Sequence, residues 1–422
     1  METWASTSVA DCLVPVPVAG KSKVQSRDYK PAGRFPVIDQ GKEQIAGWTD
    51  DESAVIDAPL PLVVFGDHTR AFKFVNTPFA RGADGTQLLR PKPEIDPLFF
   101  FYACRSIDLP ARGYNRHFTV LKEKKFSYPM GGDEQKAIAG VLRQTEAALQ
   151  KQSELLQTLQ ELKRACMREL FTRGLRGEPQ KETEIGPMPE SWSPRTILDL
   201  CEIWSGGTPR KSVSEYWSGD IPWVSGKDLK RPALDDAIDH VSAAGVDAGS
   251  RLAPEGAVLL LVRGMGLAKD LPIAVINRPM AFNQDVKALV SRGPYSGQFL
   301  RSAIYAGKER LLSQIVPSAH GTMTLNLNDV ETFKVACPSD PDEAKDIVTI
   351  LHTIDRKIDL HQKKREVLED LFQSLLHKLM TGEIAVSDLD LSALSPASTQ
   401  YEEATARARS RSVKPARCSS RW

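Results

Sequence analysis

The sequence predicts an α+β chain made of two similar globular parts, each followed by one long helix. Two observations lead to this prediction. An apolar heptad pattern occurs twice at a constant separation, so that Ile138 in the first copy corresponds to Ile347 in the second. The stretches outside these patterns consist of short strand-like runs that end at Gly and Pro turns. A repeat this long indicates a duplicated half-protein rather than a solenoid.

Both helices are predicted from the spacing of their apolar residues. Steps that alternate between four and three residues give a period of about 3.5, which is typical of a coiled-coil seam. The seam comprises Ile138, Leu142, Leu149, Gln152, Leu156 and Leu159 in the first helix, and Ile347, Leu351, Ile354, Ile358, His361, Leu368, Phe372, Leu375 and Leu379 in the second. The first seam continues through Lys163. Gln152 and His361 interrupt the two seams at the same place, and we expect them to pair with each other or to set the register.

Turn signals and composition divide the chain further. The first globular part covers residues 1–132, and the first helix covers 133–175 and is roughly 60 Å long at the usual rise per residue. A linker at 176–189 precedes the second globular part at 190–340, and the second helix covers 341–383. Residues 384–422 are rich in Ser, Ala and Arg, and we expect this tail to be disordered.

The composition excludes several classes of protein. With 55 basic and 54 acidic residues, the surface has no uniformly basic coat, so any nucleic-acid binding must use local patches. The six cysteines are scattered without a C-x-x-C pair, which favours reduced thiols over a disulfide framework or a metal site. There is no signal pattern, and no apolar run approaches the ~20 residues that span a bilayer. We therefore expect a cytoplasmic protein without a membrane partner.

Several segments resemble the specificity (S) subunit of type I restriction–modification enzymes. In the second half these are the Ser-Gly-Gly-Thr-Pro-Arg-Lys run that begins at 205, the Glu-Tyr-Trp-Ser-Gly-Asp-Ile-Pro-Trp-Val run at 215–224, Phe-Asn-Gln-Asp-Val-Lys-Ala-Leu at 282–289, and the helix end at 374–384. In the first half, 64–69 and 113–118 resemble another subtype of the same domain. The resemblance covers about residues 1–385, and the arginine-bearing tail has no counterpart in it.

The resemblance implies a fold and a function. The globular parts would be two target-recognition domains of mixed α/β structure, each of which reads one half of a split DNA sequence. The two helices would form an antiparallel coiled coil that acts as a spacer. Two methyltransferase (M) subunits and restriction/translocase (R) subunits would be the partners, together with double-stranded DNA. The chain itself would be non-catalytic and bind no cofactor, because S-adenosylmethionine, ATP and Mg are expected on the partner subunits.

Candidate DNA contacts lie in polar segments beside the predicted strands and turns. Hydroxyl, guanidinium and ammonium groups suit phosphates and base edges, and amides suit adenine. The candidates in the first part are Asp67, His68, Thr69, Lys73, Asn115, Arg116 and His117, and those in the second are Thr208, Arg210, Lys211, Ser212, Lys227, Arg263, Asn283, Gln284 and Lys287. Structural interpretations stay open: a solvated turn at 208–212, a core salt bridge for Arg263, turn caps at 283–285, and internal hydrogen bonds in the first part.

Patterns that suggest catalysis have simpler explanations. Asn76-Thr77-Pro78-Phe79 differs from the methyltransferase Asn-Pro-Pro-Phe/Tyr loop in its second residue, and no glycine-rich cofactor turn accompanies it. The acidic residues of 342–345 stand at a predicted helix start, where the helix dipole favours them. No G-x-x-x-x-G-K-[ST] motif occurs. We therefore predict neither a catalytic nor a metal site, and the alternative function is a coiled-coil protein-interaction scaffold without sequence-specific DNA binding.

Overall fold

The computed structural model describes residues 4–390 except 19, 83–84, 111–115 and 318–320. The chain forms two compact units. The first combines residues 1–154 with 363–422, and the second consists of 155–362. Each unit therefore contains one globular part and a segment of both long helices, whereas the sequence pattern assigns one whole helix to each globular part.

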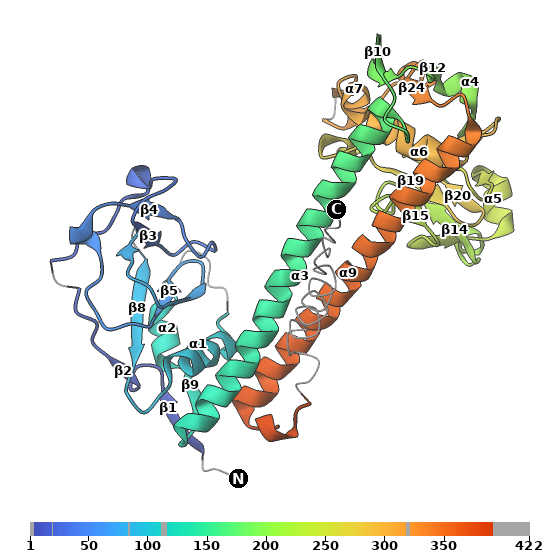
Figure 1. Ribbon diagram of the computed structural model, residues 1–422. Helices are drawn as coiled ribbons and strands as arrows, with labels where there is room; N and C mark the ends of the chain where they lie inside the picture. Colours follow the sequence, from blue (N-terminus) through green and yellow to red (C-terminus); the bar gives the residue numbers. More distant parts are fainter. Residues whose placement is uncertain (1–3, 19, 83–84, 111–115, 318–320, 391–422) are drawn as a thin grey trace, which may run out of the picture. The chain divides into compact units, whose positions relative to one another are not determined.

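The two long helices are α3 (Gly132–Arg173) and α9 (Pro341–Thr381) (Figure 1). Acidic residues occupy both first turns, where they interact favourably with the positive end of the helix dipole. Gly174 and Gly382 follow the two helices with φ of 65° and 71°, the left-handed conformation that glycine adopts easily after a helix end. Among the described residues, no helix has the length and apolar character needed to cross a membrane.

The first unit is built on small sheets beside two short helices. Its four-stranded sheet has the order β2 (Leu13–Val14), β8 (Thr86–Pro91), β5 (Leu62–Gly66), β6 (Phe72–Val75). A three-stranded sheet has the order β4 (Gly47–Thr49), β3 (Phe35–Ile38), β7 (Ala80–Arg81). β1 (Trp4–Ser8) pairs with β9 (Lys125–Pro129) in antiparallel register. The helices of this part are α1 (Pro97–Ser106) and α2 (Phe118–Glu123).

Helix α1 connects the sheet to the long helices of the first unit. Asp96 caps it by accepting hydrogen bonds from the backbone N–H groups of Leu98 and Phe99, both at 2.9 Å. Its aromatic side chains enter a core that also contains Ile138 from the start of α3 and Phe372 near the end of α9. Because the start of one long helix shares this core with the end of the other, the two helical segments run antiparallel here.

The second unit contains a five-stranded and a four-stranded sheet. The five-stranded sheet has the order β13 (Cys201–Ser205), β21 (Val286–Ser291), β18 (Val258–Leu261), β19 (Ile273–Ile276), β15 (Ala233–Leu234). The four-stranded sheet has the order β16 (Asp239–Val241), β14 (Ile221–Val224), β20 (Met280–Phe282), β17 (Leu252–Ala253). Strand pairs are β10 (Gln180–Thr183) with β11 (Gly186–Pro189), β12 (Ser193–Thr196) with β24 (Lys334–Cys337), and β22 (Val316–Pro317) with β23 (Met323–Thr324).

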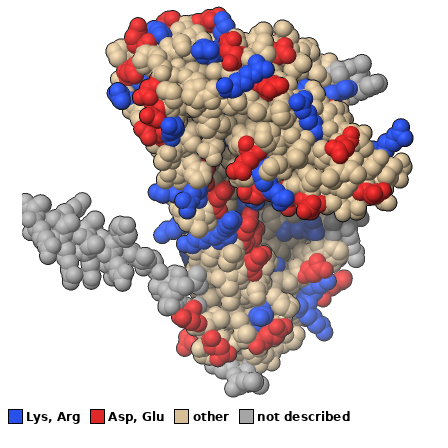
Figure 2. Space-filling model, turned by 90° about the vertical axis from the view of Figure 1, so that its right-hand side faces the viewer, with Lys and Arg blue, Asp and Glu red and all other residues tan. Residues whose placement is uncertain are grey.

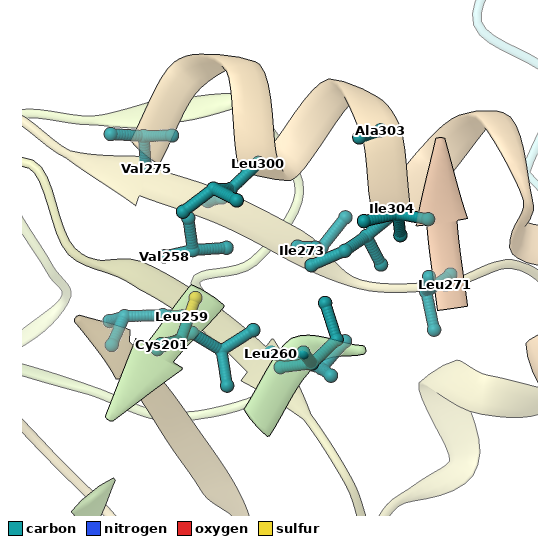
Figure 3. Close-up of a cluster of buried hydrophobic side chains, with 14 of the residues drawn as sticks. Cys201, Val258, Leu259, Leu260, Leu271, Ile273, Val275, Leu300, Ala303 and Ile304 are labelled. Atoms are coloured by element: carbon teal, nitrogen blue, oxygen red, sulfur yellow. The ribbon is translucent and has the colours of Figure 1, made fainter. Parts of the chain in front are cut away.

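Five helices flank these sheets: α4 (Ile197–Leu200), α5 (Ala243–Gly249), α6 (Gly297–Ala306), α7 (Lys308–Leu312) and α8 (Leu327–Glu331). Strand β18 is buried along its whole length, as its unbroken apolar sequence predicts. Figure 3 shows the side chains of Leu300, Ala303 and Ile304 from α6 meeting those of β18 and β19. This core fixes the sheet that carries the candidate contact residues of the second part.

The long helices also run antiparallel within the second unit. Glu343, in the first turn of α9, accepts hydrogen bonds from the Leu175 N–H at 2.8 Å and from Trp192 Nε1 at 3.1 Å, so it lies beside the residues that follow α3. Every seam residue named above is buried or half-buried, whereas Arg365, which the same heptad spacing places in the second seam, is exposed. Gln152 belongs to the first unit and His361 to the second.

Candidate nucleic-acid interface

Two motif segments that lie far apart in the sequence meet in the second part. Strand pairing between β13 and β21 places Ser205 opposite Lys287, and Lys287 Nζ donates a hydrogen bond to Ser205 Oγ at 2.8 Å. Thr208 Oγ1 donates to Gln284 Oε1 at 2.7 Å. The hydroxyl, amide and ammonium groups of these four side chains therefore form one polar patch at the end of the sheet.

The Gly-Gly turn allows this patch to form. A Cβ atom on Gly206 would lie 2.2 Å from the carbonyl oxygen of Phe282, and one on Gly207 would lie 2.3 Å from the carbonyl oxygen of Gly249. Trp223 Nε1 also donates to the Gly207 carbonyl at 3.0 Å. These glycines are required for close backbone packing, and that packing holds the following Thr208 against Gln284.

The loop after the turn presents free charge. Arg210, Lys211 and Ser212 are exposed. Trp217 Nε1 donates to the Arg210 carbonyl at 3.4 Å, which ties the loop backbone down. Within the described residues neither Arg210 nor Lys211 forms an ion pair, so both charged groups face solvent. Guanidinium and ammonium groups in this situation suit phosphates and the acceptor edge of guanine.

Arg263 joins the same region from another strand end. Its backbone N–H donates to the Asp285 carbonyl at 3.3 Å, and the residue bridges to Thr324. The side chain is exposed and forms no ion pair with any described residue, which argues against a core salt bridge. Arg263 therefore lies next to the 283–285 turn with its guanidinium directed away from the core.

Asn283, Gln284 and Lys227 differ in their availability. Asn283 is 8% exposed, and its Oδ1 accepts from the Asp285 N–H at 3.2 Å, which is the geometry of a turn cap. Gln284 is exposed. Lys227 is exposed as well, but its Nζ donates to Asp239 at 2.7 Å, and this hydrogen bond raises the pKa of Lys227. Of the three, Gln284 is the most accessible to a ligand.

One residue of the interface has no sequence signal. The Arg251 guanidinium lies 3.9 Å from the ring centroid of Trp204, the residue before Ser205 in β13. Arg251 is exposed, and the preceding Ser250 is hydrogen-bonded to the Phe282 carbonyl at 3.1 Å. Stacking on the indole fixes the plane of the guanidinium and leaves its N–H edges free, the arrangement that suits bidentate recognition. Arg251 belongs to none of the sequence motifs, so only the fold shows that it stacks on Trp204.

In the first part, three candidates are internal. Asp67 is 2% exposed and accepts a hydrogen bond from the Phe118 N–H at 2.7 Å. His117 is also buried, with Nδ1 2.9 Å from the Asp67 carbonyl oxygen. Lys73 is 3% exposed, and its Nζ lies 3.5 Å from Asp39 Oδ1. Burial lowers the pKa of Lys73 although Asp39 opposes that shift. This placement favours the structural interpretation for all three.

The other candidates of the first part are more accessible. His68 and Arg116 are exposed, and Thr69 is half-buried with its hydroxyl donating to the Gln40 carbonyl. The backbone N–H of His68 donates to Gln40 Oε1 at 3.4 Å, so Gln40 contacts two successive residues of the 66–70 turn. Asn115 lies outside the described residues. His68 and Arg116 are thus the exposed candidates of this part.

The chemistry available elsewhere is limited. Across the described ranges, no group of three or more His, Cys, Asp or Glu residues is arranged to hold a metal ion. Burial raises the pKa of Cys12, Cys201 and Cys337 to about 12, which keeps these thiols protonated and unreactive at neutral pH. Figure 2 shows basic and acidic side chains intermixed over the face in view.

Comparison with known proteins shows what the chain is similar to. Residues 189–370 match the model of the type I restriction modification DNA specificity domain. The chain is 25% identical to the EcoR124I/EcoR124II specificity subunit of Escherichia coli over 376 residues. This match covers 84% of this chain and 90% of that protein.

Two solved structures share the fold. The S subunit of a type I restriction-modification system from M. genitalium has a TM-score of 0.61 and 18% identity, and covers 90% of this chain and 96% of its own. A chain from a study of complex assembly and conformational transition of the type I R-M system has a TM-score of 0.51 and 16% identity. This match covers 90% of the present chain and 98% of that one. Residues 189–370 thus form a type I restriction modification DNA specificity domain, and most of the chain is similar in sequence and fold to specificity subunits of type I restriction–modification systems.

Proposed function

We propose that this chain is the DNA-recognition subunit of a type I restriction–modification complex and reads an asymmetric site in two separated halves. The observation that carries the proposal is the patch in the second part. There Thr208 is hydrogen-bonded to Gln284 and Lys287 to Ser205. Arg210 and Arg263 lie in the adjoining segments and form no ion pair with any described residue. Such a set combines base-edge donors and acceptors with cations for the DNA backbone.

Two units support reading in two halves. Each contains one globular part with its own exposed polar side chains, and the two parts share few surface residues, so the half-sites would differ in sequence. Helices α3, of 42 residues, and α9, of 41 residues, each contribute a segment to both units. Their length would set the spacer between the half-sites. Half-sites about one helical turn of DNA apart, roughly 34 Å, are within reach of helices of this length.

Chemistry would then reside on the partners. The proposed partners are two methyltransferase subunits, which modify adenine with S-adenosylmethionine, and restriction/translocase subunits, which use ATP and Mg. The chain would bind none of these cofactors and would act in the cytoplasm as a non-catalytic subunit. Relatives named as specificity subunits support this division of labour.

The test is a methylation map. The chain is co-expressed with the methyltransferase encoded beside it in a host that lacks DNA methylation, and modified adenines are located by long-read sequencing. The expected result is one asymmetric split motif with a fixed spacer. A stable complex that methylates a contiguous motif, or nothing, would contradict the proposal and favour the protein-interaction scaffold.

A further inference from the structure

We propose that a basic groove in the second unit binds the sugar–phosphate backbone of the DNA beside the half-site read by the second part. The inference rests on the proposed function and adds a second contact surface to it. The groove has a volume of about 780 Å³. Its walls come from α3, α6, the start of α7, α9 and the two loops that follow β14 and β18. All of its residues belong to the second unit.

Charge in this groove departs from that of the whole chain. Seven cationic side chains line it: Lys163, Arg164, Lys230, Arg231, Lys269, Arg301 and Lys308. Only three acidic side chains line it: Asp270, Asp355 and Asp359. The whole sequence carries a formal charge of +1, so an excess of four positive charges in one groove is a local concentration.

Part of this charge serves the fold. Lys163 pairs with Asp355, and Lys308 donates to Asp270 at 2.7 Å. Arg301 forms part of the inner wall, with its Nε 3.4 Å from the Ile273 carbonyl oxygen. Burial lowers the pKa of Arg301, while the nearby Asp355 opposes that shift. These groups maintain the shape and the positive potential of the groove.

The remaining cations are available to a ligand. Arg164, Lys230, Arg231 and Lys269 are exposed, and among the described residues none of them forms an ion pair. Arg164 is oriented by a contact from its Nε to the Gln160 carbonyl at 3.4 Å. One of these cations lies on a long helix and three lie on loops, so they follow the groove rather than converge on one point. A spaced series of cations suits successive phosphates of a duplex better than a single small anion.

The groove continues from the candidate interface through its loops. The loop after β14 carries Lys227 at its start and Lys230 and Arg231 further on. The segment after β18 carries Arg263 and then Lys269. Because each loop contributes both to the candidate interface and to the groove, one duplex can contact both surfaces.

The experiment separates backbone contact from base reading. A triple variant, Lys230→Gln, Arg231→Gln and Lys269→Gln, is assembled with the methyltransferase, and its affinity for target and non-target duplexes is measured over a series of salt concentrations. Each lost phosphate contact should reduce the slope of log affinity against log salt by about 0.9. We expect the affinity to fall by the same factor for the target and the non-target duplex. The salt slope should become smaller by about 3, and the methylation motif should stay unchanged.

The matched control replaces three exposed cations of the second unit that do not line the groove: Arg176→Gln, Arg278→Gln and Arg292→Gln. It should leave the slope unchanged. If the groove variant keeps the wild-type slope, or loses the methyltransferase instead of DNA, the groove is not a DNA surface and the inference is wrong. If the wild-type complex shows no preference for any duplex, the proposed function itself fails, and this outcome is distinct from the others.

Discussion

Lys163 of α3 and Asp355 of α9 form an ion pair across the two long helices of the second unit, with side chains 17% and 21% exposed. Lys163 occupies a seam position of the heptad pattern, where an apolar residue is usual. Burial lowers its pKa, and Asp355 opposes the shift. Asp355 also interacts with Arg301, so one carboxylate serves two partly buried cations.

Loss of Asp355 should therefore cost more stability than loss of Lys163. Asp355→Asn removes the carboxylate that pairs with Lys163 and interacts with Arg301, and we expect it to lower the free energy of unfolding by about 2–4 kcal/mol. Lys163→Met removes one of the cations and should cost about 1 kcal/mol or less, and the double variant with Asp355→Leu should cost less than Asp355→Asn alone. Urea unfolding checks this order, and an Asp355→Asn protein as stable as the wild type would refute it.

The Gly-Gly turn offers a steric test. Gly206→Ala places a methyl group against the Phe282 carbonyl, and we expect a loss of about 2–3 kcal/mol in the stability of the second unit. Gly293→Ala is the control, because a Cβ atom there has no described neighbour within 4 Å. Thermal unfolding of both variants measures the difference. Equal melting temperatures would show that the turn tolerates a side chain.

Arg251 should contribute to recognition of one half-site. Arg251→Ala removes the stacked guanidinium, and we expect a loss of about 1–3 kcal/mol in binding to the target duplex. Trp204→Leu should have a smaller effect in the same direction, because it removes only the surface that orients the arginine. Affinities are measured on duplexes altered in either half-site. If Arg251→Ala weakens discrimination at both halves equally, this role is excluded.

The pair formed by Asp270 and Lys308 predicts a pH dependence. Partial burial opposes the shift, but hydrogen bonds from Lys308, from the Leu271 N–H and from Tyr305 outweigh it and lower the pKa of Asp270. A carboxyl group whose pKa is lower in the folded state stabilises above its unfolded pKa of about 3.9, and this stabilisation disappears as the pH falls through the folded value.

The Asp270→Asn variant should therefore have a lower melting temperature than the wild type. The difference should be constant between about pH 5 and 8 and should become smaller below about pH 4. Melting curves across this range provide the measurement. If the difference in melting temperature stays constant below about pH 4, the carboxylate charge does not stabilise the fold.

The periodicity of the sequence was sufficient to predict the long helices. Seam positions such as Ile138 and Ile347 are buried and favour apolar residues, whichever residues occupy the surface. The periodicity was insufficient for the first globular part. Asp67 and Lys73 are polar but occupy the interior, and only the positions of their partners, Phe118 and Asp39, show this. Nor does a linear pattern indicate that Arg251 stacks on Trp204, since that contact depends on how β17 and β13 are arranged in the fold.

We expect the second part to read one half-site independently of the first. The most direct measurement compares the methylation motif of the wild-type complex with that of a variant carrying Arg210→Gln and Lys211→Gln. We predict that one half of the split motif becomes weaker or less strict, while the other half and the spacer stay unchanged. Equal loss at both halves, or a contiguous motif in the wild type, would contradict the account.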